Sequence, residues 1–189
     1  MPLNLPILLT WLRVALIPVF VGLFYLPDVL VSMPMKNMIG ATIFAVAALT
    51  DWFDGYLARR WNQTSSFGAF LDPVADKLMV AAALILLVEI GRAPAWLAVI
   101  IIGREITISA LREWMAQLGK TKSVAVAYIG KLKTAAQMLA ILFLLWSGPL
   151  LPGVPTDLIG AIALYIAGVL TIVSMFYYLR VAAQQFREG

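Results

Sequence analysis

The chain of 189 residues contains no cysteine and no histidine. The first absence excludes disulfides, thiolate metal ligands and cysteine nucleophiles. The second removes the side chain that most often serves proteins as a general base or metal ligand. Any catalysis must therefore use carboxylates, lysines, arginines or hydroxyls, and any metal ion must be held by oxygen atoms.

Charge is also scarce in this sequence. Charged residues make up 13% of the chain, apolar residues make up 62%, and the mean hydropathy is +0.93. An ordinary soluble domain has about 25% charged and about 45–50% apolar residues. So few charges could not cover the apolar surface of a globule this size, so the composition excludes a soluble enzyme. The formal charge of +4 suits anionic lipid head groups or anionic substrates.

Several apolar segments are long enough to cross a membrane, since a span needs about 20 mostly apolar residues. They cover residues 5–26, 37–57, 67–88, 93–111, 123–146 and 158–179. Short connections marked by proline, glycine and asparagine separate them. We expect the first segment to be a span and not a cleavable signal, because no basic leader precedes it. The sequence thus predicts an all-α fold, a single integral-membrane domain over residues 1–189 with six transmembrane helices in one bundle.

Lysines and arginines are unevenly divided between the two sides of this predicted bundle. If both termini share a side, that side holds all of the 14 basic residues except Lys36 and Arg92. Positive charge favours the cytoplasm. Both termini are therefore predicted to be cytoplasmic.

Charged residues inside the predicted spans fall at one depth. They occupy the first half of spans one, three and five and the second half of spans two and four, and consecutive spans run in opposite directions. A charge in hydrocarbon costs about 3 kcal/mol or more, so we expect these residues to line a shared polar cavity open to the cytoplasm. They are Arg13, Asp51, Asp54, Asp72, Asp76, Lys77, Arg104, Glu105, Arg112, Lys131 and Lys133.

The four aspartates among them have helical spacing. Asp51 and Asp54 are three residues apart, and Asp72 and Asp76 are four apart, so each pair shares one face of its helix. Carboxylates crowded in a low-dielectric cavity repel one another, and a divalent cation or a pair of cations resolves that conflict. Ligation by oxygen alone favours Mg²⁺ or Mn²⁺, with Ca²⁺ left open. Small residues accompany both pairs, namely Gly55, Ala58 and Gly68.

Simpler interpretations exist for some of these residues. A single buried aspartate in a membrane helix is often only a hydrogen-bonding group in helix packing, but two spaced pairs at one depth are harder to explain in that way. Arg59 fits a positive-inside anchor as well as a functional role. Tyr178, near the end of a span, is predicted to be an interfacial belt residue.

The aspartate segment reads Asp51-x-x-Asp54-Gly55-x-x-Ala58-Arg59, eight further residues, and Gly68-x-x-x-Asp72-x-x-x-Asp76. This pattern resembles the signature of the CDP-alcohol phosphatidyltransferases. The resemblance extends along most of the chain, to Asn4-Leu-Pro6, Thr10, Arg13, the segment from Arg104 to Arg112, and Gly130-Lys131-x-Lys133-Thr134. These segments are similar to bacterial members of the family that use glycerol 3-phosphate as the acceptor.

The resemblance implies a role for each matching residue. Asp51, Asp54 and Asp72 would hold two divalent ions, Mg²⁺ or Mn²⁺, on the diphosphate of CDP-diacylglycerol, while Asp76 would assist and act as the base. The remaining CDP-lipid-binding residues would be Gly55, Ala58, Arg59, Gly68, Asn4, Thr10 and Arg13. Gly55 and Ala58 would leave room for the cytidine. The resemblance also implies a multi-pass protein of the bacterial inner membrane, commonly a homodimer, which releases CMP.

The acceptor can also be considered from charge. Cations suited to an acceptor phosphate lie on the cytoplasmic halves of spans four and five, namely Arg104, Arg112, Lys131 and Lys133. A neutral acceptor such as serine would not call for them, so glycerol 3-phosphate is favoured. An inositol phosphate satisfies the same argument, and the cations could also merely balance the carboxylates and contact lipid head groups.

A membrane cation transporter is the rival interpretation, because intramembrane carboxylates also mark ion pathways. Two features argue against it: the charges stay at one depth, and the spans show no paired halves. A lipid-bound structural protein would need no carboxylate cluster. We therefore expect an enzyme whose partners are CDP-diacylglycerol, glycerol 3-phosphate, CMP and membrane lipids, with no nucleic-acid partner.

Overall fold

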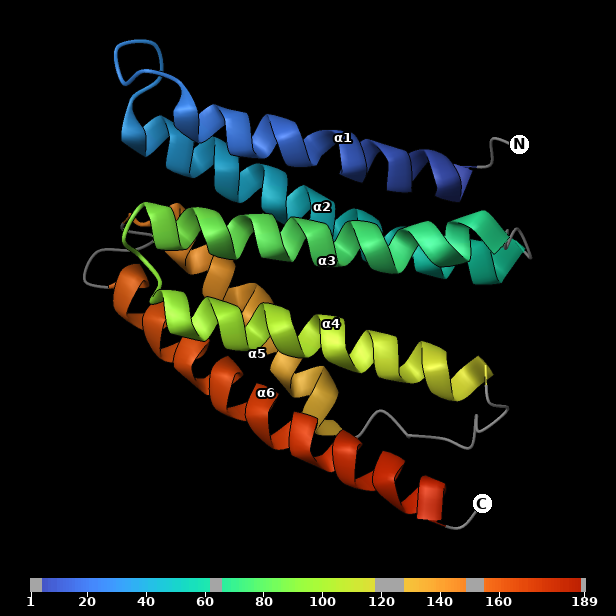
Figure 1. Cartoon of the computed structure of the whole chain (residues 1–189). Helices are drawn as coiled ribbons and strands as arrows, with labels where there is room; N and C mark the ends of the chain where they lie inside the picture. Colours follow the sequence, from blue (N-terminus) through green and yellow to red (C-terminus); the bar gives the residue numbers. More distant parts are fainter. Residues whose placement is uncertain (1–4, 62–65, 118–127, 149–154, 188–189) are drawn as a thin grey trace.

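The computed structural model describes residues 5–61, 66–117, 128–148 and 155–187, with side chains at 8–50, 70–117, 132–148, 155–180 and 182–183. These stretches form six helices (Figure 1). They are α1 (Leu5–Tyr25), α2 (Met33–Trp61), α3 (Ser66–Glu89), α4 (Ala95–Gln117), α5 (Tyr128–Trp146) and α6 (Thr156–Arg187). Each helix coincides with one of the six predicted segments, so the all-α prediction is confirmed.

Three helices, α2, α4 and α6, extend four or more residues beyond the predicted segments. α2 begins at Met33, and Pro34 lies in its first turn. A proline is tolerated there because its missing N–H has no partner within the helix in any case. The predicted span began at residue 37, so α2 begins four residues earlier than predicted. α6 continues to Arg187, past the predicted end of the apolar segment.

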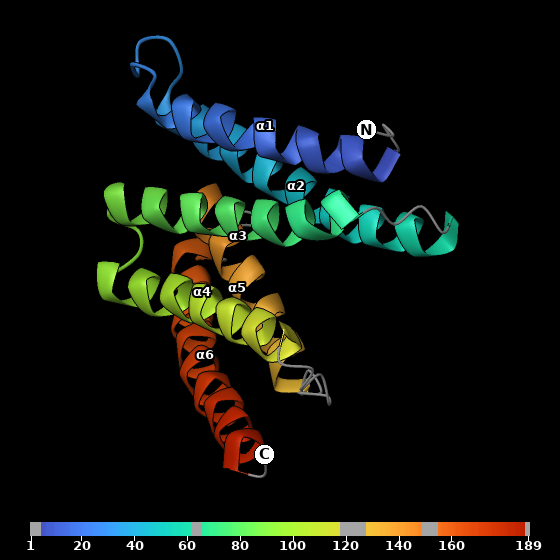
Figure 2. The same ribbon diagram turned by 45° about the vertical axis from the view of Figure 1, so that its right-hand side comes forward.

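The helices form a bundle in which α3 is central (Figure 1). α1 packs on α2, and both contact α3, which also contacts α4 and α5. α5 packs along α6, and α6 also contacts α4; α5 closes the bundle by contacting α2. Figures 1 and 2 show α6 inclined to α3, with the N-terminus and the C-terminus at the same end of the bundle. We call this the terminal end.

Apolar side chains lie both inside and outside the bundle. Its core is formed by α1 to α6 and includes Phe20, Phe44, Leu84, Ile101, Ile141 and Leu164. The exposed apolar side chains of α6 recur at helical spacing along one face, at Leu158, Ile162, Tyr165, Ile166, Val169, Val173 and Phe176. Soluble monomers rarely expose a continuous apolar surface of this kind, so it indicates contact with lipid.

Apolar length gives a second indication of a membrane protein. In the described part of the chain, three helices are long and apolar enough to cross a membrane, over Leu8–Tyr25, Met33–Thr50 and Thr156–Arg180. α3 and α4 are long enough but carry the charged residues that were predicted to line the site. The described apolar part of α5, Leu132–Trp146, is shorter.

At the end of the bundle opposite the terminal end, basic side chains cap the C-terminal ends of two helices. Lys36 is 2% exposed; its Nζ lies 2.6 Å from Asp28 and donates to the carbonyl of Leu26 at 2.5 Å, just past the end of α1. Arg92 Nη1 donates to the carbonyls of Leu144 and Leu145 in the last turn of α5, at 3.0 and 3.2 Å. A cation stabilises the negative end of a helix. The two basic residues on this side of the bundle therefore have structural partners.

Glycine is required at one turn and at one helix contact. Gly91 follows α3 with a φ of 74°, a left-handed conformation that commonly ends helices. Gly160 of α6 lies against α5, where a Cβ atom would stand 2.9 Å from Cγ of Leu144. A side chain at residue 160 would therefore force α5 and α6 apart.

Candidate active site

The candidate site lies in the half of the bundle toward the terminal end. Described polar side chains from α1, α3, α4, α5 and α6 meet there. The residues that carry its contacts are Thr10, Arg13, Asp72, Asp76, Arg104, Glu105, Arg112, Lys133, Gln137, Ser174 and Tyr178. Charged residues of separate helices therefore lie together in this half of the bundle.

Asp72 is joined to α1. Thr10 is 1% exposed, and its hydroxyl donates a hydrogen bond to Oδ1 of Asp72. This bond fixes the orientation of a carboxylate that was predicted to bind a metal ion. Thr10 was predicted only as a CDP-lipid-binding residue, and sequence spacing could not have revealed its contact with α3.

Asp76 lies one turn further along α3, between two small cavities. One, of about 10 Å³, is lined by Arg13 of α1 and by Asp76. Arg13 is 1% exposed, so its charge is almost entirely enclosed by the bundle. The other cavity, of about 50 Å³, lies on the α4 and α5 side of Asp76. Asp76 can therefore contact a ligand that enters between α3, α4 and α5.

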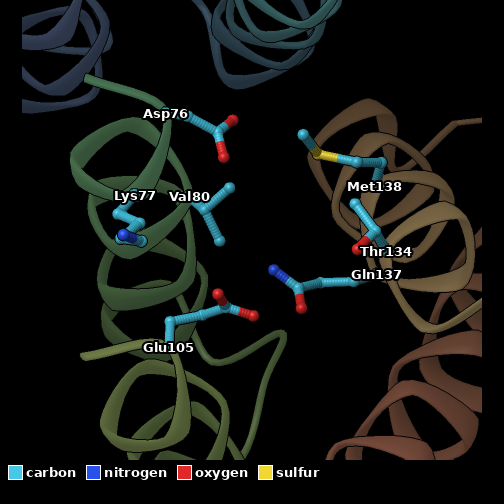
Figure 3. A pocket seen from close by; sticks show the side chains of 7 residues that line it. All are labelled: Asp76, Lys77, Val80, Glu105, Thr134, Gln137 and Met138. Carbon is cyan, nitrogen blue, oxygen red and sulfur yellow. The ribbon is translucent and has the colours of Figure 1, made fainter. Parts of the chain in front are cut away.

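The larger cavity is built from three helices (Figure 3). Asp76 and Val80 project into it from α3, Glu105 reaches it from α4, and Gln137 projects from α5 toward Glu105. The full lining is Asp76, Lys77, Val80, Glu105, Thr134, Gln137 and Met138. Carboxylate, amide, hydroxyl and ammonium groups thus surround a space that is larger than one water molecule.

Glu105 forms ion pairs with two of the residues predicted to bind the acceptor phosphate. Its Oε1 forms an ion pair with Lys133 of α5, which is 2% exposed. Arg104 Nη1 lies 3.3 Å from the same oxygen. Glu105 was predicted to be one of the charges inside the spans, but no role was predicted for it. Its position next to Arg104 was the available signal, whereas its pairing with α5 depends on tertiary structure.

The two arginines of α4 also contact α6. Arg104 Nη2 donates to Oγ of Ser174 at 3.1 Å, and Arg112 Nη2 donates to the hydroxyl of Tyr178 at 2.8 Å. The Cζ atoms of Arg104 and Arg112 lie 5.4 and 5.0 Å from the centre of the Tyr178 ring, within the range of cation–π attraction. Tyr178 is 4% exposed. The prediction that Tyr178 is an interfacial belt residue was therefore wrong.

Several predicted site residues fall outside the described side chains. The backbone places Asp51, Asp54, Gly55, Ala58 and Arg59 near the end of α2 and Gly68 in the first turns of α3. Their side chains, and that of Lys131 in α5, lie outside the described part of the structure, as does Asn4 altogether. Their predicted roles stay predictions.

The described side chains include only part of the predicted metal-ligand set. Among the described residues there is no group of three carboxylates that could hold an ion. Asp72 and Asp76 are half-buried and one helical turn apart. They supply the oxygen donors that Mg²⁺ and Mn²⁺ prefer, and so they fit half of the predicted ligand set.

Comparison with known proteins identifies the family. A family model described as CDP-alcohol phosphatidyltransferase matches residues 3–173. The chain belongs to the CDP-alcohol phosphatidyltransferase family. The match extends from α1 into α6, and so it includes the site residues of α1, α3, α4 and α5, and it ends just before Ser174.

Full-length relatives within the CDP-alcohol phosphatidyltransferase family are also similar to this chain. A protein of Pectobacterium atrosepticum is 56% identical over 191 residues, and one of Sodalis glossinidius is 54% identical over 194 residues; both alignments cover 100% of each chain. A protein of Salmonella typhimurium is 52% identical over 185 residues, or 96% of each chain. All three are named CDP-diacylglycerol–glycerol-3-phosphate 3-phosphatidyltransferase.

Proposed function

We propose that the protein transfers the phosphatidyl group of CDP-diacylglycerol to glycerol 3-phosphate, giving phosphatidylglycerophosphate and CMP. The observation that carries this proposal is the 56% identity, over the whole length of both chains, to a relative named for that reaction. The arrangement of the site agrees with it, because Asp76 of α3 and Glu105 of α4 line a common cavity, and Glu105 pairs with Lys133 of α5.

The proposed location is the bacterial inner membrane, with six spans and both termini in the cytoplasm. The exposed apolar face of α6 and the three long apolar helices support a membrane location. The inward orientation rests on the distribution of lysine and arginine. In this orientation the terminal end of the bundle, with the candidate site, is on the cytoplasmic side, where a water-soluble acceptor is available. The homodimer implied by the family resemblance stays a prediction.

Asp51, Asp54, Asp72 and Asp76 are proposed to hold two divalent ions, Mg²⁺ or Mn²⁺. Bound there, the ions would neutralise the diphosphate of CDP-diacylglycerol and stabilise the leaving group. The hydrogen bond from Thr10 fixes one carboxylate of this set. Gly55, Ala58, Arg59, Gly68, Asn4 and Arg13 are proposed to bind the rest of the CDP-lipid.

Asp76 is proposed to act as the general base. The acceptor hydroxyl oxygen forms a bond to the phosphorus that carries the diacylglycerol, while the bond from that phosphorus to the bridging oxygen breaks. The electron pair of the broken bond leaves on CMP, and the hydroxyl proton moves to the Asp76 carboxylate. With no histidine in the chain, a carboxylate that lines the cavity is the available proton acceptor.

Arg104, Arg112, Lys131 and Lys133 are proposed to bind the acceptor phosphate. Glu105 neutralises Lys133 and contacts Arg104 in the described structure. A phosphate that enters the cavity would share these cations with Glu105. Asp76 and Glu105 line one cavity, and Glu105 contacts both Arg104 and Lys133. An acceptor held by its phosphate at these cations would therefore have its hydroxyl near Asp76.

Lys133→Met is expected to weaken the use of glycerol 3-phosphate. Removing a charge-assisted contact of about 1.5–3 kcal/mol predicts a rise of KM for the acceptor of about 10- to 100-fold, with a smaller change of kcat. Steady-state CMP release at varied acceptor concentration measures both constants. Arg180→Met, which removes an exposed cation of α6, is the control and should leave KM unchanged. An unchanged KM in the Lys133 variant would remove this lysine from the phosphate site.

Product analysis tests the proposed function as a whole. Purified protein in detergent is given CDP-diacylglycerol, Mg²⁺ and one acceptor at a time: glycerol 3-phosphate, inositol phosphate or serine. We expect CMP and phosphatidylglycerophosphate with glycerol 3-phosphate only. A product from inositol phosphate alone would reassign the acceptor, whereas ion flux into liposomes without any CMP would support the transporter interpretation.

A further inference from the structure

The side chain of Gln137 has an unused hydrogen-bonding group inside the larger cavity. Gln137 is 4% exposed, and its Oε1 is buried with no hydrogen-bond partner among the residues that the structure describes. A buried carbonyl oxygen without a partner costs about 1–3 kcal/mol, and most such atoms in proteins are paired. The oxygen therefore requires a donor that enters the cavity.

Gln137 lies near both Lys133, a proposed phosphate-binding residue, and Asp76, the proposed base. It follows Lys133 by four residues on α5, so both side chains lie on one face of the helix, about 6 Å apart along its axis. The Gln137 amide projects into the cavity toward Glu105, and Asp76 lines the same cavity from α3 (Figure 3). Lys133 pairs with Glu105, which lines this cavity, so a small ligand with its phosphate at Lys133 and its reacting end at Asp76 would also contact Gln137.

Glycerol 3-phosphate has one group for each of these residues. Its phosphate matches the cations, its primary hydroxyl is the group that reacts, and its secondary hydroxyl lies between them. We propose that Gln137 determines acceptor specificity by accepting a hydrogen bond from this secondary hydroxyl. The inference rests on the proposed function, which assigns the other two groups but gives Gln137 no role.

The physical consequence is discrimination against acceptors that lack the middle hydroxyl. Such an acceptor would leave Oε1 unpaired in a closed site, and binding sites reject analogues most strongly when a buried polar group loses its partner. The natural comparison is 3-hydroxypropyl phosphate, which keeps the phosphate and the primary hydroxyl. Both acceptors can react through the same bond changes, so only the contact with Gln137 differs between them.

The experiment measures kcat/KM for glycerol 3-phosphate and for 3-hydroxypropyl phosphate as CMP release by the full-length protein. The wild-type protein should prefer glycerol 3-phosphate by about 10- to 100-fold. Gln137→Met, which keeps the length of the side chain but removes its amide, should reduce this preference to about 3-fold or less. Met138→Leu, a change of an apolar residue in the same cavity, should keep the wild-type preference.

The ratio separates a specificity role from a structural one, because damage to the fold lowers both rates together. A Gln137→Met protein that keeps the wild-type ratio would overturn the proposal, whatever its absolute rate. So would a wild-type ratio close to one. If the wild-type protein released CMP with neither acceptor, the proposed function itself would be contradicted, which is a different result from a failure of the Gln137 assignment alone.

Discussion

Asp76→Asn is expected to lower the rate of CMP release by about 10²- to 10⁴-fold, the usual contribution of a general base. Asparagine has nearly the same shape and keeps one oxygen ligand, but it cannot take up the proton of the acceptor hydroxyl. CDP-diacylglycerol binding should change much less, because Asp51, Asp54 and Asp72 are left to hold the metal ions. The variant is thus expected to bind the CDP-lipid and to form little product.

Two measurements on one preparation test this prediction: CMP release in single-turnover conditions, and binding of CDP-diacylglycerol by equilibrium titration. Asp157→Asn is the matched control, since Asp157 is an exposed carboxylate in the first turn of α6, away from the site. The control should show wild-type turnover. If the Asp76 variant also turned over at the wild-type rate, Asp76 would not be the base.

Removal of divalent metal is expected to have an effect at least as large. Dialysis against EDTA should lower CMP release to background, a loss of about 10³-fold or more, because the phosphate charge is then no longer neutralised. Addition of Mg²⁺ or Mn²⁺ should restore activity. Ca²⁺, which takes more ligands at longer distances, should restore less.

Two controls distinguish metal loss from damage by the chelator. EDTA that has been saturated with Mg²⁺ beforehand should have no effect on the rate. The melting temperature of the dialysed protein shows whether the bundle remains folded. Full activity of a folded, metal-free protein would contradict the proposed chemistry.

Much of the fold could be predicted from the sequence because long apolar segments separated by turn-forming residues indicate where the helices lie. Each predicted segment corresponds to one of the six described helices. The ends were less predictable, since they depend on local chemistry. Pro34 interrupts an apolar pattern but is acceptable in a first helical turn. The polar end of α6 continues the helix beyond its apolar part, where hydropathy gives no signal.

The candidate site could be predicted in position but not in its contacts. Helix direction and charge position together indicated that Asp72 and Asp76 share a depth with Arg104 and Lys133. Which groups touch depends on how far each helix is rotated about its axis, and packing decides that rotation.

Tyr178 and Gln137 illustrate this difference. The position of Tyr178 near the end of a span predicted an interfacial residue, but the packing of α4 on α6 turns its ring toward two arginines. Gln137 is an uncharged residue in an apolar segment, so only its burial and its cavity mark it as part of the site. Sequence spacing contains neither piece of information.

The proposed chemistry depends on acidic groups of α2 and α3 that together hold divalent cations at the terminal end of the bundle. The most direct test is an experimental structure of the Mn²⁺-loaded protein with anomalous scattering recorded at the manganese edge. We expect manganese peaks enclosed by the carboxylates of Asp51, Asp54, Asp72 and Asp76. A structure of the loaded protein in which these carboxylates point toward lipid or away from one another, with no manganese between them, would contradict it.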